Sequence, residues 1–242
     1  MNIISFEEIT STNLYLKENY QNLANHTICT SKTQTLGRGR LGRSWQDSEG
    51  SALFSILVKE NINNITMIPL ISAYAILNVL KNLNTKTDLK VKWPNDIIIN
   101  SKKLVGVLVE GITTDKVEAI IIGIGININN ESFNSEVSSI ASSLYLETKK
   151  KFDINKIIID ISKLIIELLD KKDTNYIIDY LNENSYLLDK KVSFNYKGEN
   201  LDGVVRKINY DGSLEIDSSN QKYNVFSGEV TLTNTYKQVV EK

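Results

Sequence analysis

The most informative stretch of the sequence is Gly37-Arg38-Gly39-Arg40-Leu41-Gly42-Arg43-Ser44-Trp45. The chain of 242 residues has four arginines, and three of them fall here, whereas lysine supplies almost all other positive charge. Arginine offers a planar, permanently charged fork that matches phosphate or carboxylate. Glycine lets backbone N–H groups approach a ligand closely. The stretch is therefore typical of a loop that binds an anion, with Trp45 available to stack on a base.

Length and composition indicate an ordinary globular protein. With 41% hydrophobic and 24% charged residues, 242 residues suffice for one large domain and a small one. The formal net charge of −1 gives no general attraction to nucleic acid or anionic membranes, so any positive site must be local. The single cysteine, Cys29, excludes an intramolecular disulfide and favours a reducing, cytoplasmic location. We expect neither a signal peptide nor a membrane span, because the chain has no suitable apolar run.

The apolar pattern predicts a sheet of several strands with few helices, followed by a helical part and a small β-barrel. Strands are expected at 3–9, 27–33, 52–58, 90–92, 97–99, 104–110 and 117–124, and helices at 14–22 and 66–83. From Ser138 to Glu183 the apolar spacing is helical, with Ile140 as one of its positions. Short strands separated by turns follow from about residue 190. We therefore expect an α+β fold with two domains, 1–188 and 189–242.

Three polar residues follow the first strand: Ser11, Thr12 and Asn13. All are helix-capping types, so the simplest interpretation is an N-cap. Their hydroxyl and amide groups could instead hold a small polar ligand.

A second stretch holds the other tryptophan and one of the two prolines: Lys92-Trp93-Pro94-Asn95-Asp96, followed by Lys102-Lys103-Leu104-Val105-Gly106. As structure alone it is a strand, a turn and a hairpin. Lys103 opens the later strand, so it can point into the same cleft as the arginine loop. An ammonium there could bring together two anions that would otherwise repel each other.

A third stretch ends a strand: Gly123-Ile124-Gly125-Ile126-Asn127. Its glycines could allow close approach of a ligand, with Asn127 as a polar contact. The longer dinucleotide-binding glycine pattern and the P-loop are both absent from the sequence. His26 is the only histidine, so a zinc site or a pair with Cys29 has little support, and we assign packing roles to both on the second strand.

In this order and with this spacing, the motifs resemble those of biotin–protein ligases. The resemblance rests on Gln34, the arginine loop, the two later stretches and Gly228-Glu229 near the C-terminus. It implies the catalytic fold shared by biotin–lipoate ligases and class II aminoacyl-tRNA synthetases, a central mixed β-sheet with packed helices, plus a small Src-homology-3-like barrel.

The resemblance also implies a two-step ligation in the cytoplasm. The carboxylate of biotin attacks the α-phosphate of ATP to give biotinyl-5′-AMP and pyrophosphate. A lysine amine of a biotin carboxyl carrier protein then attacks the mixed anhydride and releases AMP. Mg²⁺ would share the task of neutralising the phosphates.

Site roles follow from the resemblance, residue by residue. Lys103 and Arg40 would be catalytic. The implied biotin-binding residues are Ser11, Thr12, Asn13, Gln34, Gly37, Arg38, Gly39, Arg40, Lys103 and Gly106. The implied ATP- and adenylate-binding residues are Arg38, Arg40, Arg43, Trp45, Lys103 and Asn127, with Trp45 against adenine. Asp96 would support the site or its metal, and no metal ligand is named.

Many bacterial relatives in this family also carry an N-terminal DNA-binding domain. Here the catalytic strand begins at Ile3, so the resemblance implies a monofunctional ligase that does not bind DNA, with weak homodimerisation left open. Two alternatives remain. A lipoate or octanoate ligase shares the fold, although its double-arginine, triple-glycine signature is absent. A nucleic-acid contact through arginine and tryptophan is disfavoured by the neutral net charge.

Overall fold

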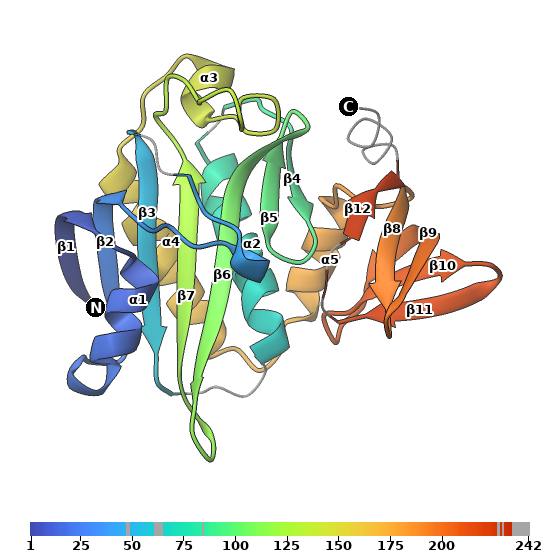
Figure 1. The fold of residues 1–242 in the computed structure, drawn as a ribbon, viewed down its shortest axis with the longest axis horizontal. Coiled ribbons are helices and arrows are strands. Elements are labelled where there is room, and N and C mark those ends of the chain that lie inside the picture. The colour runs from blue at the N-terminus through green and yellow to red at the C-terminus, as the bar shows by residue number, and fades with distance from the viewer. Residues whose placement is uncertain (47–48, 61–64, 84, 227, 229, 234–242) are drawn as a thin grey trace.

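A seven-stranded mixed sheet forms the larger part of the molecule (Figure 1). The computed structural model describes residues 1–46, 49–60, 65–83, 85–226, 228 and 230–233. The strands of the sheet are β1 (Asn2–Ile9), β2 (Thr27–Gln34), β3 (Ser51–Val58), β4 (Leu89–Lys92), β5 (Asp96–Ile99), β6 (Lys102–Thr113) and β7 (Val117–Asn127). Their order is β1-β2-β3-β7-β6-β5-β4, with β1 and β2 parallel and all other neighbours antiparallel. The predicted α+β fold with a central mixed sheet is confirmed.

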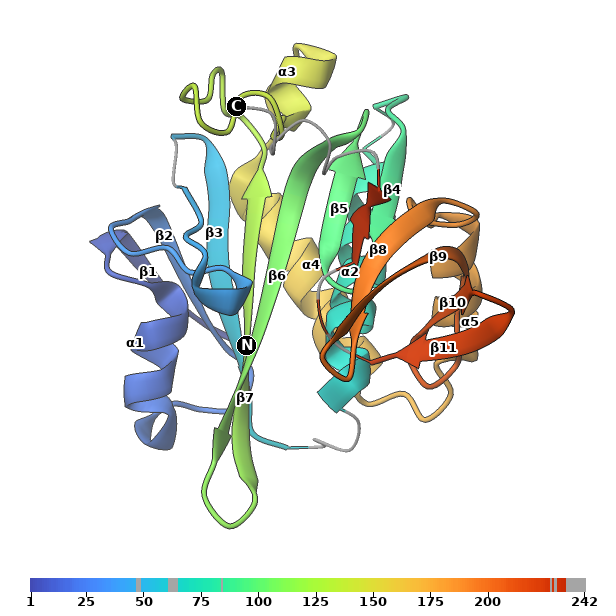
Figure 2. The same ribbon diagram turned by 45° about the vertical axis from the view of Figure 1, so that its right-hand side comes forward.

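Helices cover the sheet on both faces. α1 (Thr12–Asn19) packs on β2, β3 and β7 on one face, whereas α2 (Ile68–Lys81) and α4 (Ile154–Leu169) lie on the other (Figures 1 and 2). β3 is buried at every position, because α1 covers it on one face of the sheet and α4 on the other. A small apolar cluster lies beneath α1: Leu16, Cys29, Leu57, Ala119 and Ile121. α1 covers only part of this face of the sheet, over β2, β3 and β7. The functional site described below lies on the same face, beside α1.

A second, antiparallel sheet follows at the C-terminal end. Its strands are β8 (Lys191–Tyr196), β9 (Glu199–Ile208), β10 (Leu214–Ser218), β11 (Gln221–Val225) and β12 (Val230–Leu232), in the order β11-β10-β9-β8-β12. α5 (Asn175–Glu183) packs between α2 and β9, and the apolar core runs without a break from one sheet to the other. The proposed boundary between 1–188 and 189–242 falls just before β8, and the division into two domains stays a prediction. Glu229, which contributed to the resemblance, lies outside the described residues.

The predicted helical part needs one correction at its start. Ile140 is not helical: it lies in a turn, and 63% of its surface is exposed. Its carbonyl accepts a hydrogen bond from the backbone N–H of Lys103 at 2.7 Å, and the N–H of Ser142 donates to the carbonyl of Lys103 at 3.0 Å. Residues 140–142 therefore pair with the start of β6. The first helix of this part of the chain is α3, which spans only Leu144–Thr148.

Two smaller expectations also change. His26 lies in the turn before β2 with a positive φ of 60°, not on the strand. None of the helices in the described part of the chain has the length and apolar character needed to span a membrane.

Trp93 joins the two sheets. Its indole is 2% exposed, and its Nε1–H donates to the carbonyl of Gly212 at 3.0 Å in a turn of the second sheet. Gly212 has a φ of +86°, and a Cβ there would lie 3.1 Å from Sδ of Met67, just before α2, and 3.3 Å from Cδ1 of Leu70 in α2. The first sheet and α2 therefore both contact this turn closely.

We expect Trp93→Phe to lower the free energy of unfolding by about 1–3 kcal/mol, because it leaves a buried carbonyl without its donor. Urea denaturation followed by circular dichroism measures this. Tyr210→Phe is the matched control, since it removes an exposed hydrogen bond of 2.9 Å to Asp179. If both variants lose the same stability, the indole contact does not hold the sheets together.

Candidate active site

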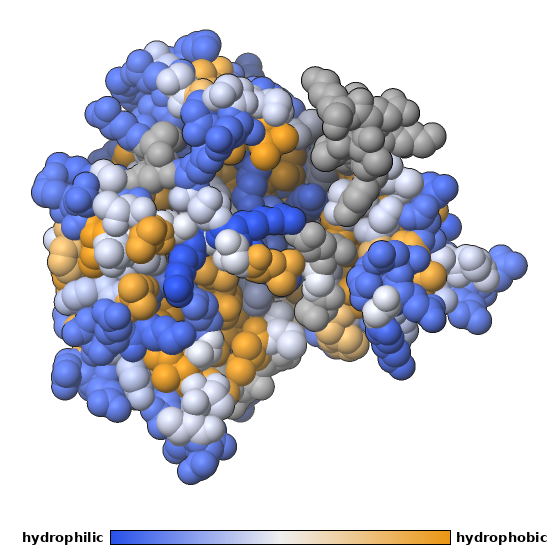
Figure 3. Space-filling view, in the orientation of Figure 1, coloured by the Kyte–Doolittle hydropathy of each residue, from blue (hydrophilic) through white to orange (hydrophobic). Residues whose placement is uncertain are grey.

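A single cavity of about 350 Å³ brings together the stretches identified in the sequence. It lies beside α1, between the first sheet and the β12 end of the second. Figure 3 shows strongly hydrophilic side chains across the centre of this face. The lining comes from five places: the start of α1 with Gln34, the loop 38–45, the turn 92–96, the facing parts of β6 and β7, and residues 228, 230 and 231. Residues far apart in the sequence therefore share one cavity.

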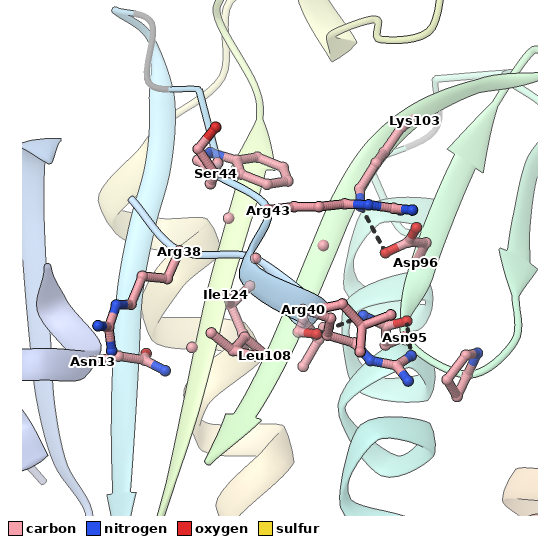
Figure 4. Close-up of a pocket in the computed structure, with 18 of the residues that line it drawn as sticks. Asn13, Arg38, Arg40, Arg43, Ser44, Asn95, Asp96, Lys103, Leu108 and Ile124 are labelled. Atoms are coloured by element: carbon pink, nitrogen blue, oxygen red, sulfur yellow. Dashed lines mark hydrogen bonds and ion pairs between the residues drawn. The ribbon is translucent and has the colours of Figure 1, made fainter. Parts of the chain in front are cut away.

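Positive charge dominates this cavity. Among the described lining residues, five are cationic, namely Arg38, Arg40, Arg43, Lys92 and Lys103, and one is a carboxylate, Asp96. Oδ1 of Asp96 lies 2.9 Å from Nζ of Lys103. Figure 4 marks this ion pair with a dashed line. Cationic side chains therefore outnumber anionic ones in the described lining, which suits polyphosphates and carboxylates.

The arginine loop folds back on itself. Arg38 and Ser44 form an isolated antiparallel bridge, and the N–H of Gly39 donates to the carbonyl of Arg43 at 2.7 Å. The tip is a short 3₁₀ turn (Arg40–Gly42) in which Gly42 has a φ of +76°. This left-handed conformation suits glycine. Figure 4 shows the arginines spread along the cavity, with Arg38 on the side of Asn13 and Arg43 on the side of Lys103.

Trp45 lies on a floor of two glycines. Gly106 and Gly125 are cross-strand partners on β6 and β7. A Cβ at Gly125 would lie 2.6 Å from the indole ring of Trp45, and one at Gly106 would lie 2.9 Å from it. Nζ of Lys103 is 5.7 Å from the ring centroid, within the range of a cation–π contact. In the structure the group that lies against Gly106 and Gly125 is the indole of Trp45, and the approach of a ligand to these glycines stays a prediction.

Polar side chains at the start of α1 form a buried cluster. Ser11 is the N-cap of the helix, with its Oγ accepting from the N–H of Leu14, so the capping interpretation is correct for this residue. The backbone N–H of Thr12 donates to Oε1 of Gln34 at 2.7 Å. Asn13 fits because Gly123 has no side chain: a Cβ there would lie 2.7 Å from Cγ of Asn13. All three residues of the cap line the cavity, so capping and ligand binding are compatible.

Asn95 holds Arg40, a contact that the sequence did not reveal. Its side-chain oxygen accepts from Nη1 of Arg40 at 2.9 Å, and its own amide donates to the carbonyl of Val107 at 2.7 Å (Figure 4). Nη2 of Arg40 also lies 3.5 Å from the carbonyl of Gly228, next to β12. Arg40 therefore joins the loop, the first sheet and the second sheet.

Two predicted site residues lie outside this cavity. Asn127 is buried at the end of β7, and its amide donates to the carbonyl of Ser142 at 3.1 Å. Gly37 lines a neighbouring groove, and its carbonyl accepts from the N–H of Trp45 at 3.0 Å. Their contacts with nucleotide and biotin stay predictions.

Other chemistry has little support in the structure. Burial raises the pKa of the Cys29 thiol to about 12, so it is a poor nucleophile at neutral pH. Among the described residues, no group of three or more histidine, cysteine, aspartate or glutamate side chains is placed to hold a metal ion.

Comparison with known proteins agrees with this geometry. Residues 4–127 match the model of the biotin/lipoate A/B protein ligase family. The chain belongs to this family. The bifunctional ligase/repressor BirA of Bacillus spizizenii is 36% identical over 132 residues, which cover 52% of this chain and 41% of that protein. BirA of Escherichia coli is 26% identical over 237 residues, which cover 95% of this chain and 73% of that protein.

Among solved structures of this family, biotin protein ligase from Aquifex aeolicus in complex with biotin and ATP has the same fold. It superposes with a TM-score of 0.86 and 30% identity, covering 96% of this chain and 98% of that chain. The match of this chain spans about two fifths of the length of the Bacillus relative. The resemblance inferred from the motifs is therefore confirmed at the level of family and fold.

Proposed function

We propose that this chain is a biotin–protein ligase, which joins biotin to a lysine of a biotin carboxyl carrier protein through biotinyl-5′-AMP. The main support for this proposal is that one cavity combines a buried, uncharged polar cluster with a cationic loop. Biotin has a neutral ureido head group and a carboxylate at the end of an apolar chain. Its two ends therefore match the two parts of the cavity.

The first step joins two anions. A carboxylate oxygen of biotin forms a bond to the α-phosphorus of ATP, and the bond to the bridging oxygen breaks as pyrophosphate leaves with the electron pair. Lys103 lies between Asp96, at the start of β5, and the ring of Trp45, where its ammonium can contact both anions. Arg40 and Arg43 would neutralise charge on the phosphates, which is the electrostatic task of such a site.

The second step transfers the biotinyl group. The neutral amine of the carrier lysine attacks the acyl carbon, and AMP leaves with its phosphate stabilised by the same cations. Water would compete with the amine, so the intermediate must be shielded. The arginine loop lines the cavity and would act as this cover, opening when the carrier arrives.

Mg²⁺ would neutralise the β- and γ-phosphates in the first step. Asp96 is the one carboxylate among the described lining residues, and it pairs with Lys103. Mg²⁺ commonly binds through one or two carboxylates plus substrate phosphates, so this residue set fits an ion held mostly by the nucleotide. Trp45 would contact adenine, and we place the reaction in the cytoplasm.

A carrier-labelling assay tests the proposal. The protein is incubated with ATP, Mg²⁺ and a biotin carrier domain, with biotin in one arm and lipoate in the other. We expect one carrier lysine to gain biotin, detected by mass spectrometry, and no comparable gain from lipoate. Transfer of lipoate but not biotin would assign the chain to the other branch of the family.

We expect Arg40→Ala to slow biotinyl-5′-AMP formation and to release the intermediate into solution, with an effect of about tenfold to a hundredfold. The variant loses the contacts to Asn95 and Gly228 as well as the charge. Rapid-quench sampling with separation of bound from free adenylate measures both effects. Arg206→Ala is the control, because Arg206 pairs with Asp189 and Asp217 in the second sheet, outside the cavity. Equal adenylate yield and retention in both variants would remove Arg40 from the mechanism.

A further inference from the structure

Glu110 lies on β6 behind the polar cluster and does not line the cavity. Its Oε2 accepts a hydrogen bond from Nδ2 of Asn13 at 2.8 Å. Its Oε1 lies 4.0 Å from Nη1 of Arg38, and 22% of its side chain is exposed. One carboxylate therefore contacts both the polar cluster and the arginine loop.

The carboxylate fixes the direction of a chain of hydrogen bonds. An ionised carboxylate can only accept, so the amide nitrogen of Asn13 must face Glu110 and its Oδ1 must face Ser55. Ser55 then donates its single proton to this oxygen, at 2.6 Å. The 2.7 Å contact between Thr12 and Ser55 must therefore be a hydrogen bond donated by Thr12.

This direction decides what the cavity offers to a ligand. The proton of Thr12 goes to Ser55 at 2.7 Å, which is shorter than its 3.1 Å contact with Gln34. Oγ1 of Thr12 and Oδ1 of Asn13 are left with lone pairs and no proton to donate. Both residues line the cavity, so these two oxygens can accept hydrogen bonds from a ligand that carries N–H donors.

We propose that Glu110 is a positioning residue that orients this chain, so that the cluster accepts hydrogen bonds from the ureido N–H groups of biotin. The inference rests on the proposed function. Glu110 also faces Arg38, so the side chain that orients the head-group cluster is linked to the loop above it.

Glu110→Gln tests the inference, because it preserves the shape of the side chain and adds an N–H donor. Glutamine can donate to Asn13, so the Asn13 amide can turn over and reverse the chain. We expect the dissociation constant of biotin to rise about tenfold, as for loss of a hydrogen bond to a charged group. The preference for biotin over biotin methylated on a ring nitrogen should fall by a similar factor. Calorimetric titration of both ligands measures the ratio.

The outcomes separate the two proposals. Glu7→Gln is the control, because Glu7 is exposed and pairs with Lys32 at 2.8 Å on the same sheet, and it should leave both affinities unchanged. If Glu110→Gln lowers the affinity for both ligands equally, or for neither, the residue does not orient the cluster. This inference then fails, and the proposed function is unaffected. If the unmodified protein binds no biotin, the proposed function fails and this inference with it.

Discussion

Replacing Lys103 with alanine is expected to slow biotinyl-5′-AMP formation about a hundredfold or more, with the fold unchanged. The ammonium is the cation that pairs with Asp96 and faces the ring of Trp45. Without it, the carboxylate of biotin and the α-phosphate repel each other with less compensation. The side chain is 38% exposed, and the backbone stays bonded to residues 140 and 142 on either side. Truncation therefore removes charge without opening a buried void.

Biotin-dependent release of pyrophosphate from ATP measures this effect. Lys102→Ala is a close control, because the neighbouring lysine does not line the cavity and donates to the carbonyl of Ser138 at 3.1 Å. We expect the control to keep the rate of the unmodified protein. Similar rates in the two variants would show that Lys103 does not act where the two anions meet.

Replacing Gly123 with alanine is expected to weaken biotin binding about a hundredfold, which is more than the loss of one hydrogen bond. The added Cβ would lie 2.7 Å from Cγ of Asn13 and closer still to its side-chain oxygen. Asn13 is 4% exposed, and moving away from the added methyl group would break its bonds to Ser55 and Glu110. Overpacking of this kind also costs about 1–3 kcal/mol of stability.

Gly111→Ala separates the local effect from the general effect of changing a strand glycine. Gly111 lies on the adjacent strand β6, and a Cβ there would meet only Oγ1 of Thr113, at 3.8 Å. Fluorescence or calorimetric titration with biotin compares the two variants, and circular dichroism checks that each is folded. Tight biotin binding by Gly123→Ala would mean that the position of Asn13 does not matter for the ligand.

Local patterns in the sequence predicted most of the fold. The strands and the helices α1, α2 and α5 carry a regular local spacing of apolar residues, so periodicity found them. The prediction of a helix at Ile140 was wrong. Its apolar side chain fits a helical repeat, whereas its carbonyl accepts a hydrogen bond from the backbone N–H of Lys103, 37 positions earlier. Pairing between distant segments leaves no periodic signal.

The same distinction applies to the site. The concentration of arginine in the loop and the place of Lys103 at a strand start are visible in the sequence, and the structure brings them to one cavity. Glu110 and Ser55 were not recognised from the sequence, because glutamate and serine occur at many positions and neither residue belongs to a motif. They meet Asn13 only through the placement of α1 against β3, β7 and β6. Asn127 shows the reverse case, a motif residue that the fold turns away from the cavity and toward Ser142.

The central claim is that biotin and ATP occupy one cavity side by side. Calorimetric titration of the unmodified protein with biotin, with and without a non-hydrolysable ATP analogue, tests it most directly. We predict one biotin bound per chain in both titrations, with the analogue bound at the same time. Absence of biotin binding, or displacement of biotin by the analogue, would contradict the account.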